Sequence, residues 1–401
     1  MIEYKFPLGH DVHDSDDLLN MIKPIIAGKI TMGTQVEAFE RDFAKYLGVR
    51  HAVMVNSGSS ANLLAISALT NYKYSQKLNA GCEVLVPAVC WSTSIFPLIQ
   101  CNLKPVFVDV DSKTLNINLE DLEQKITDKT KALMLVHVLG NCTNMNKLMA
   151  LVVKYNLILV EDTCESLGST YNGRYFGTFG TFGTYSYYYS HHLCTFEGGC
   201  IVTNDDELFE LTKTLRAHGW SRHLNNKDQI EKENPYLDPR FTFVNLGYNV
   251  RPMEIQASMG IGQLQKLKSK NDNRKINYLN IKNKIENDPR NTFLSFANET
   301  DNADVVWFGV TLFLDSSIKL SNYLNYLTEN GVENRPIVTG NIVRQPVIKD
   351  LYPNINPLDF PGAEECHFRG LFIGLSSSLM SDLLINELVD ILLSYEDFSH
   401  G

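Results

Sequence analysis

Short apolar stretches typical of buried strands alternate with helix-like stretches through the first two-thirds of the chain. The expected strands are residues 51–55, 83–87, 104–110, 132–138 and 157–161. Helical patterns separate several of them, at residues 92–100, 119–125 and 147–155. Strands joined through helices pair in parallel, because the helix carries the chain back to the same end of the sheet. The sequence therefore predicts an α/β fold with a mostly parallel sheet covered by helices.

The pattern changes near residues 249–252, where a second domain is expected to begin. A helical run from Met253 to about Lys270 leads into an Asn- and Lys-rich segment, 269–288. Beyond it lie a strand-like stretch at 305–314 and helix-like stretches at 321–330 and 381–395. A chain of 401 residues is long enough for two cores. We predict an N-terminal segment and large domain over 1–268 and a small α+β domain over 269–401.

Composition and charge exclude several classes of protein. The net charge of −10 opposes bulk attraction to nucleic acid or to an anionic membrane. No apolar run reaches 18 residues, so no membrane span is expected. Residues 1–10 lack the pattern of a signal peptide, and the eight cysteines form no C-x-x-C pair. These features predict a cytoplasmic protein with free thiols, without a disulfide framework and without a zinc ribbon.

A short polar turn, Ser57-Gly58-Ser59-Ser60, stands between an expected strand and an expected helix. Free backbone N–H groups at a helix N-terminus, helped by hydroxyls, suit a phosphate group. A capped helix after a tight turn would have the same sequence pattern, so this turn alone does not distinguish a phosphate site from an ordinary helix cap.

Acidic and aromatic residues follow two other strands. Glu161, Asp162 and Glu165 lie at the end of an apolar strand, where ligands of open α/β sheets gather. A carboxylate there can pair with a pyridinium nitrogen, or it can simply cap the next helix. Trp91 follows the 83–87 strand and could stack on a planar ring, or it could lie in the core.

The segment from Ser186 to Gly199 carries two adjacent histidines, His191 and His192. An aromatic strand over 185–189 is expected to deliver Ser186 and His191 to one turn. Histidine exchanges protons near neutral pH and can act as base and acid in turn. Two surface histidines without a role are the alternative, and a metal site is not expected because no third ligand lies at a diagnostic spacing.

Together and in this order, these segments resemble the DegT/DnrJ/EryC1/StrS family of sugar-modifying enzymes that depend on pyridoxal 5′-phosphate (PLP). The resemblance runs from about Gly28 to Gly374 and includes the 246–251 motif Leu-Gly-Tyr-Asn-Val-Arg. It implies the fold-type I architecture of aspartate aminotransferase. The expected large domain would have a seven-stranded, mostly parallel sheet and would bind PLP or pyridoxamine 5′-phosphate (PMP).

The resemblance also implies a role for single residues. Ser57, Gly58, Ser59 and Ser186 would hold the cofactor phosphate, Asp162 the ring nitrogen, and Trp91 the ring face. Glu165 would lie near the ring hydroxyl. Asn249 would reach the phosphate bound by a neighbouring subunit, which implies a homodimer with shared active sites.

One departure from the family pattern decides the expected reaction. Aminotransferases of this family have lysine five residues after the serine, whereas this chain has His191, which cannot hold the cofactor covalently. The branch of the family with histidine there consists of 3-dehydratases of nucleotide-linked 4-keto-6-deoxysugars. The resemblance therefore implies such a dehydratase, using glutamate and releasing ammonia, with GDP-4-keto-6-deoxymannose as the expected substrate.

The positions of the cysteines distinguish between two variants of this branch, one with an iron–sulfur cluster and one without. Its iron–sulfur variant needs several cysteines after the Glu197-Gly198-Gly199 turn, and residues 216–240 contain none. We therefore expect no cluster and no reductase partner. The alternatives are a cluster-free dehydratase of a CDP- or dTDP-linked sugar, a nucleotide-sugar aminotransferase, and a non-catalytic relative that binds sugar nucleotides.

Four further residues are candidates for substrate contacts. His218 is a second possible active-site histidine, in a loop that resembles the cluster-free branch. Arg222, Arg335 and Arg344 could bind the substrate diphosphate by bidentate pairing. Exposed arginines that only add solubility are the alternative for each of the three.

Overall fold

In a computed structural model of the protein, residues 4–9, 12–222 and 224–395 are described. Residues 1–3 and 10, part of the stretch in which no signal peptide is expected, lie outside the described residues. No helix in the described part of the chain is long and apolar enough to cross a membrane.

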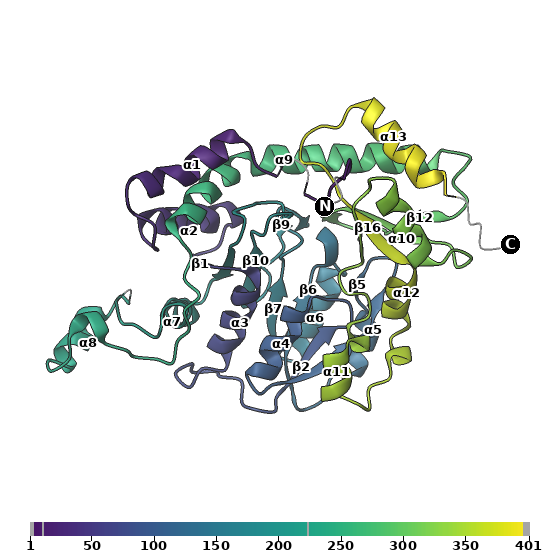
Figure 1. The fold of residues 1–401 in the computed structure, drawn as a ribbon. Coiled ribbons are helices and arrows are strands. Elements are labelled where there is room, and N and C mark those ends of the chain that lie inside the picture. The colour runs from purple at the N-terminus through teal and green to yellow at the C-terminus, as the bar shows by residue number, and fades with distance from the viewer. Residues whose placement is uncertain (1–3, 10–11, 223, 396–401) are drawn as a thin grey trace.

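The larger sheet of the protein has seven strands in the order β1-β11-β10-β7-β6-β2-β3 (Figure 1). Its strands are β1 (His51–Val55), β2 (Glu83–Pro87), β3 (Lys104–Val108), β6 (Thr130–Val136), β7 (Ile158–Asp162), β10 (Phe182–Ser186) and β11 (Gly199–Thr203). All neighbouring pairs are parallel except the two that involve β11. The predicted mostly parallel sheet is therefore confirmed.

Alternate residues of the central strands face two different layers of helices. Val84 and Val86 pack in one core with α3 (Gly58–Leu69), α4 (Ser92–Gln100) and α7 (Asp206–Arg216). Leu85 packs on the other face, in a core that contains α5 (Leu119–Gln124) and α6 (Met145–Lys154). Since both faces are buried, the strands are nearly continuous apolar runs, which is why they stood out in the sequence.

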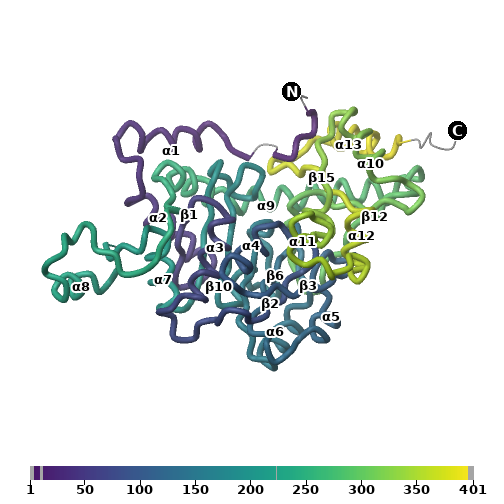
Figure 2. The backbone as a smooth tube through the Cα atoms, turned by 60° about the horizontal axis from the view of Figure 1, so that its bottom comes forward, coloured from purple at the N-terminus to yellow at the C-terminus, as the bar shows by residue number. Residues whose placement is uncertain are grey.

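The remaining helices of the first part cover β1 and β11 or extend from the body. α2 (Thr34–Leu47) packs on β1, and α1 (Ser15–Ile26) lies along the long helix α9 (Glu254–Glu286). In both views α8 (Lys227–Glu233) stands away from the main body (Figures 1 and 2).

The C-terminal part forms a four-stranded antiparallel sheet with the order β12-β14-β16-β15. Its strands are β12 (Leu294–Phe296), β14 (Val310–Leu314), β15 (Asn334–Pro336) and β16 (Gly370–Ile373), and its helices are α10 (Leu320–Glu329), α11 (Pro346–Leu351), α12 (Pro361–Arg369) and α13 (Asp382–Leu393). Two-residue strands complete the chain: β4 (Val110–Asp111), β5 (Asn116–Ile117), β8 (Thr170–Tyr171), β9 (Arg174–Tyr175) and β13 (Ala303–Asp304). An α+β arrangement was expected here.

Some predicted boundaries are wrong. The helix expected to end near Lys270 continues to Glu286, because Asn271 and Asn277 turn inward and donate hydrogen bonds to backbone carbonyls of Leu167 and Ser376. The proposed boundary at 268/269 therefore falls inside α9, and the division into domains stays a prediction. The expected strand at 305–314 begins only at residue 310, and the one at 185–189 ends at residue 186.

Candidate active site

The residues singled out in the sequence meet at one edge of the large sheet. β10, β7, β6 and β2 are parallel, and β1 runs in the same direction because β11 lies antiparallel to both β1 and β10. Their carboxyl ends therefore lie on one side. Ser57 follows β1, Trp91 follows β2, Asp162 ends β7 and Ser186 ends β10.

A cavity of about 380 Å³ opens at this edge. Eight candidate residues line it: Ser57, Gly58, Ser59, Trp91, Asp162, Glu165, Ser186 and His191. The wall is completed by Asn62, Thr93, Ser94, Val136, Cys164, Tyr188, Glu197 and Val338, the last from the C-terminal part. No lysine or arginine occurs among the described residues that line it, so His191 is the one nitrogen base in this lining.

One part of the cavity wall is a cradle for an anion. Gly58 opens α3, and the Ser57 hydroxyl accepts the Ser60 backbone N–H at 3.1 Å as the helix cap. A Cβ atom at Gly58 would lie 2.5 Å from Cβ of Ser186 and 2.9 Å from Sγ of Cys164, so only glycine fits. The Ser59 hydroxyl lies 3.0 Å from that of Thr93. Free N–H groups and hydroxyls at a helix N-terminus are suited to a phosphate.

Asp162 forms a second polar part of the wall, and its carboxylate is held by three donors. Oδ2 accepts hydrogen bonds from Nδ2 of Asn62 at 2.8 Å and from Oγ of Ser94 at 2.7 Å. Oδ1 accepts the backbone N–H of Cys164 at 3.1 Å. Asp162 is 5% exposed, so these bonds fix the direction of a carboxylate that is shielded from water. Asn62 and Ser94 were not singled out in the sequence, although polar residues inside the apolar helical stretches 61–69 and 92–100 were a signal for them.

Glu165 lies beside Asp162 and accepts the backbone N–H of Leu139 at 3.0 Å. Burial raises the pKa of Glu165 to about 7; the Leu139 N–H opposes this rise and the Asp162 charge adds to it. The carboxyl of Glu165 therefore titrates near neutral pH and can donate a hydrogen bond when protonated.

His191 sits in the turn after β10, where its backbone N–H bonds to the carbonyl of Tyr188 at 3.0 Å. Its ring packs against Tyr188 and Phe308, with ring centroids 6.0 and 5.1 Å apart. The Nδ1 atom is buried without a hydrogen-bond partner among the described residues. Burial and the nearby Arg274 charge lower the pKa of His191 to about 3, so its ring is neutral at physiological pH.

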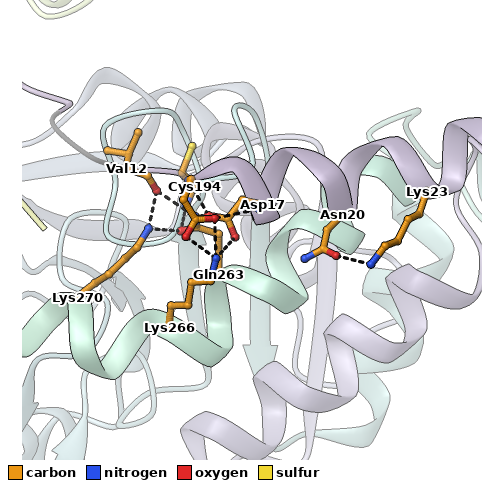
Figure 3. Close-up of polar contacts among 9 residues, drawn as sticks. Val12, Asp17, Asn20, Lys23, Cys194, Gln263, Lys266 and Lys270 are labelled. Atoms are coloured by element: carbon orange, nitrogen blue, oxygen red, sulfur yellow. Dashed lines mark hydrogen bonds and ion pairs between the residues drawn. The ribbon is translucent and has the colours of Figure 1, made fainter. Parts of the chain in front are cut away.

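The segment after His191 is anchored by α9 and by the N-terminal segment (Figure 3). Oε1 of Gln263 accepts the backbone N–H of Cys194 at 3.4 Å. The amide nitrogen of Gln263 donates to the carbonyl of Val12 at 3.0 Å and to Asp17 at 2.6 Å. Asp17 also pairs with Lys266 at 3.0 Å. This network ties the turn to two other parts of the chain, which limits its freedom to move.

Three candidates lie together outside the cavity. His218 donates its backbone N–H to the carbonyl of Tyr248 at 2.6 Å, and Ala217 forms a bridge with Asn249. The ring of His218 packs on Trp220, and the guanidinium of Arg222 lies 4.3 Å above the same indole. The structure thus brings His218, Arg222 and Asn249 together, but not among the residues that line the cavity of their own chain.

The two remaining arginines are also outside this lining. Arg335 is exposed and pairs with Glu333 at 2.8 Å. Arg344 forms a fork with Glu364, with Nε 2.7 Å from Oε1. Both guanidinium groups already have a carboxylate partner, and Arg344 is the more fully engaged of the two.

The cavity fits the expected cofactor. It offers a cradle for phosphate at Gly58 and a fixed carboxylate at Asp162 for a ring nitrogen. The flat, half-exposed indole of Trp91 also lies in its wall. Lysine is missing from the described lining, so a covalent link to the cofactor has no candidate there.

The seven-stranded sheet, this cavity at its carboxyl edge and the smaller C-terminal sheet define the class of fold-type I, aspartate-aminotransferase-like proteins. Within this class, the chain belongs to the DegT/DnrJ/EryC1/StrS aminotransferase family, whose sequence pattern matches residues 13–391.

Individual members of the family are similar over nearly the whole chain. GDP-4-keto-6-deoxy-D-mannose 3-dehydratase of Yersinia pseudotuberculosis is 39% identical over 389 residues, which cover 96% of this chain and 98% of that protein. A solved structure of the E. coli enzyme of that name with bound hydrated PLP has a TM-score of 0.89 and 37% identity, covering 97% of this chain and 100% of that one. A structure of GDP-4-keto-6-deoxymannose-3-dehydratase with a trapped PLP-glutamate geminal diamine matches with the same TM-score, identity and coverage.

Proposed function

We propose that this protein is a PLP/PMP-dependent 3-dehydratase of GDP-4-keto-6-deoxymannose. With glutamate as amino donor it would form a GDP-linked 4-keto-3,6-dideoxysugar, 2-oxoglutarate and ammonia. One observation carries the proposal: the cavity keeps its phosphate cradle and its fixed carboxylate, yet His191 occupies the place of the lysine. Relatives named for this reaction, 39% identical over 96% of the chain, support it.

The cofactor would be held without a covalent bond. Ser57, Gly58, Ser59 and Ser186 would bind its phosphate, and Trp91 would cover the ring. Asp162 would bind the ring nitrogen and Glu165 the ring hydroxyl. When bound, the cofactor supplies an electron sink for the reaction.

His191 would move the proton. Its neutral ring can accept a proton at nitrogen, and burial makes the resulting cation a strong acid. Such an acid suits the departure of the C3 hydroxyl of the sugar as water. Because no lysine amine lies in the described lining to displace the bound sugar as an aminated product, the nitrogen would leave as ammonia.

The protein would act as a homodimer with shared active sites. Support comes from exposed apolar side chains in the segment that follows α8: Tyr236, Phe241, Phe243, Leu246 and Met253 are 41–81% exposed. Asn249 lies in the same segment, His218 is hydrogen-bonded to its neighbour Tyr248, and both lie outside the cavity lining of their own chain. A second copy that covers this surface would bury these side chains and could receive both residues in its own site.

Mixed dimers test this sharing. His191→Asn and Asn249→Asp would each inactivate a site, but a mixed dimer would contain one site that carries both changes and one that carries neither. Mixing the two inactive variants should therefore restore part of the activity. Mixed dimers that form but stay inactive would contradict the shared site.

A further part of the proposal concerns the residues that bind the diphosphate of the nucleotide sugar. Arg222 and Arg335 would bind the diphosphate; Arg344 is the weakest candidate because Glu364 already holds its guanidinium in a fork. No cysteine lies in residues 216–240, which supports a reaction without an iron–sulfur cluster and without a reductase partner. A cytoplasmic location fits substrates that are soluble sugar nucleotides.

Substrate competition tests the proposal. The purified protein, with PLP and glutamate, should convert GDP-4-keto-6-deoxymannose to a product one oxygen atom lighter. CDP- and dTDP-linked 4-keto-6-deoxysugars should be converted with a kcat/KM lower by at least about tenfold. Preference for another nucleotide would replace GDP in the proposal, and no conversion of any of them would overturn the dehydratase itself.

A further inference from the structure

Among the described residues, the carboxylate of Asp162 is held by neutral donors alone. These are the Asn62 amide, the Ser94 hydroxyl and the Cys164 backbone N–H. No lysine or arginine occurs in the described lining of the cavity. Neutral donors stabilise a buried negative charge but do not cancel it. A cationic group that enters the cavity therefore meets a carboxylate whose charge has no counter-ion there.

The two oxygens of Asp162 are occupied unequally. A carboxylate has about four sites for hydrogen bonds, shared between its two oxygens. Oδ2 accepts two bonds, from Nδ2 of Asn62 at 2.8 Å and from Oγ of Ser94 at 2.7 Å. Within the described part of the chain Oδ1 accepts one, from the backbone N–H of Cys164 at 3.1 Å. The open site of this carboxylate is thus on Oδ1.

Asn62 can donate to Asp162 because the other end of its amide has a partner of its own. Its oxygen accepts the hydroxyl of Thr184 at 2.6 Å, and Thr184 lies opposite Asp162 on the neighbouring strand β10. The carbonyl of Glu161 is a more distant acceptor for the same hydroxyl, at 3.3 Å. If the amide were turned over, its oxygen would face the carboxylate, with no proton between the two acceptors. Thr184 therefore supports the one orientation in which Asn62 is a donor.

All three supporting side chains are buried. Asn62, Ser94 and Thr184 are at most 1% exposed, and they come from α3, α4 and β10. Apolar residues of similar shape could fill these positions without any polar group that needs a partner. What the polar residues add is a fixed direction for the carboxylate at which their hydrogen bonds end.

We infer that Asn62, supported by Thr184, and Ser94 are positioning residues for the cofactor ring. They occupy Oδ2 of Asp162, so that Oδ1 receives the N–H of the protonated ring nitrogen, and they leave the charge of the carboxylate to pair with that nitrogen. Since PLP is proposed to place its ring nitrogen at Asp162, the inference rests on the proposed function. It adds the accepting oxygen and the side chains on which this contact depends.

Two ligands of the cofactor-free full chain test this inference: PLP, and its deaza analogue, in which a C–H group replaces the ring nitrogen. The analogue keeps the phosphate and the ring, so the ratio of the two dissociation constants reports the contact at Asp162. The wild type should prefer PLP. Asn62→Leu and Ser94→Ala should each reduce this preference about tenfold, the usual loss for one hydrogen bond to a charged group. An equal loss of affinity for both ligands, or an unchanged ratio in Asn62→Leu, would overturn the inference.

A matched pair of variants tests Thr184. Thr184→Val leaves the amide oxygen of Asn62 without its donor, so the preference for PLP should fall and the absorbance of bound PLP should shift. Thr184→Ser keeps the hydroxyl and should restore both. Thr212→Val removes a buried hydroxyl of α7 outside the cavity lining and should leave the ratio unchanged. A ratio that Thr184→Val and Thr212→Val change alike would refute the part assigned to Thr184.

The binding ratio requires no turnover of substrate, so it is independent of the reaction. If Asn62→Leu does not fold, Ser94→Ala and the Thr184 pair carry the test. A protein whose ligand preference responds to these variants but that dehydrates no nucleotide sugar would refute the proposed function and leave this inference standing. A dehydratase whose preference for PLP is the same in the wild type, Ser94→Ala and Thr184→Val would refute the inference alone.

Discussion

Glu165→Gln should make the cofactor-free protein more stable at high pH and leave it nearly unchanged at low pH. Burial raises the pKa of Glu165 from 4.5 to about 7, so the folded protein holds a proton that the unfolded chain has released. The proton-dependent stability is fully present below pH 4.5 and is lost as the pH rises to 7 and above. The difference, 7 − 4.5 = 2.5 units, corresponds to about 3 kcal/mol. Residual solvent access reduces this value, so it is an upper figure.

Urea unfolding of both proteins at a series of pH values between 4.5 and 8 measures this effect. Glutamine keeps the acceptor for the Leu139 N–H, so the comparison isolates the ionisation. The stability advantage of the variant should grow through this interval and then level off. Glu120→Gln, at an exposed carboxylate, measures the effect of removing one surface charge. An advantage that does not change with pH would refute the argument that Glu165 is held protonated by burial.

Three further changes address the cavity directly. His191→Asn should lower kcat by about 10²–10⁴-fold while PLP affinity changes little, because the proton carrier is lost and the cofactor contacts are not; a parallel loss of affinity in a PLP titration would contradict this. Asp162→Asn should weaken PLP binding and alter the absorbance of the bound cofactor, since the ring nitrogen loses its charged partner; an unchanged spectrum would remove Asp162 from that role. Gly58→Ala should abolish phosphate binding and lower stability by about 1–3 kcal/mol, because its Cβ would lie 2.5 Å from Cβ of Ser186 and 2.9 Å from Sγ of Cys164; normal PLP affinity would show that the cradle is elsewhere.

The sequence predicted the sheet and the edge at which the site lies. The strands are buried on both faces, so they stand out as apolar runs, and parallel pairing places Asp162 and Ser186 at one edge. The order of the motifs around them then supplied the fold class. The full length of α9 was missed because Asn271 and Asn277 are buried by tertiary contacts, whereas their composition is typical of a surface segment.

The partners of the candidate residues could not be read from spacing. Asn62 and Ser94 come from two different helices and meet only at Asp162. Phe308 packs its ring against His191 from a distant part of the chain, and no pattern in the sequence joins the two residues. His218 and Asn249 were assigned to the site by resemblance, and within one chain they lie outside its lining. Residues that meet only through folding, or through association with a second subunit, are distant in the sequence, so no periodic sequence pattern indicates that they are in contact.

The fate of the glutamate nitrogen tests the central claim most directly. The protein is incubated with PLP, ¹⁵N-labelled glutamate and GDP-4-keto-6-deoxymannose, and the label is located by mass spectrometry. If His191 replaces the lysine in function as well as in position, the label appears in ammonia and the sugar product carries no nitrogen and one oxygen fewer. Labelled nitrogen retained on the sugar would show that the protein is an aminotransferase and would contradict the account.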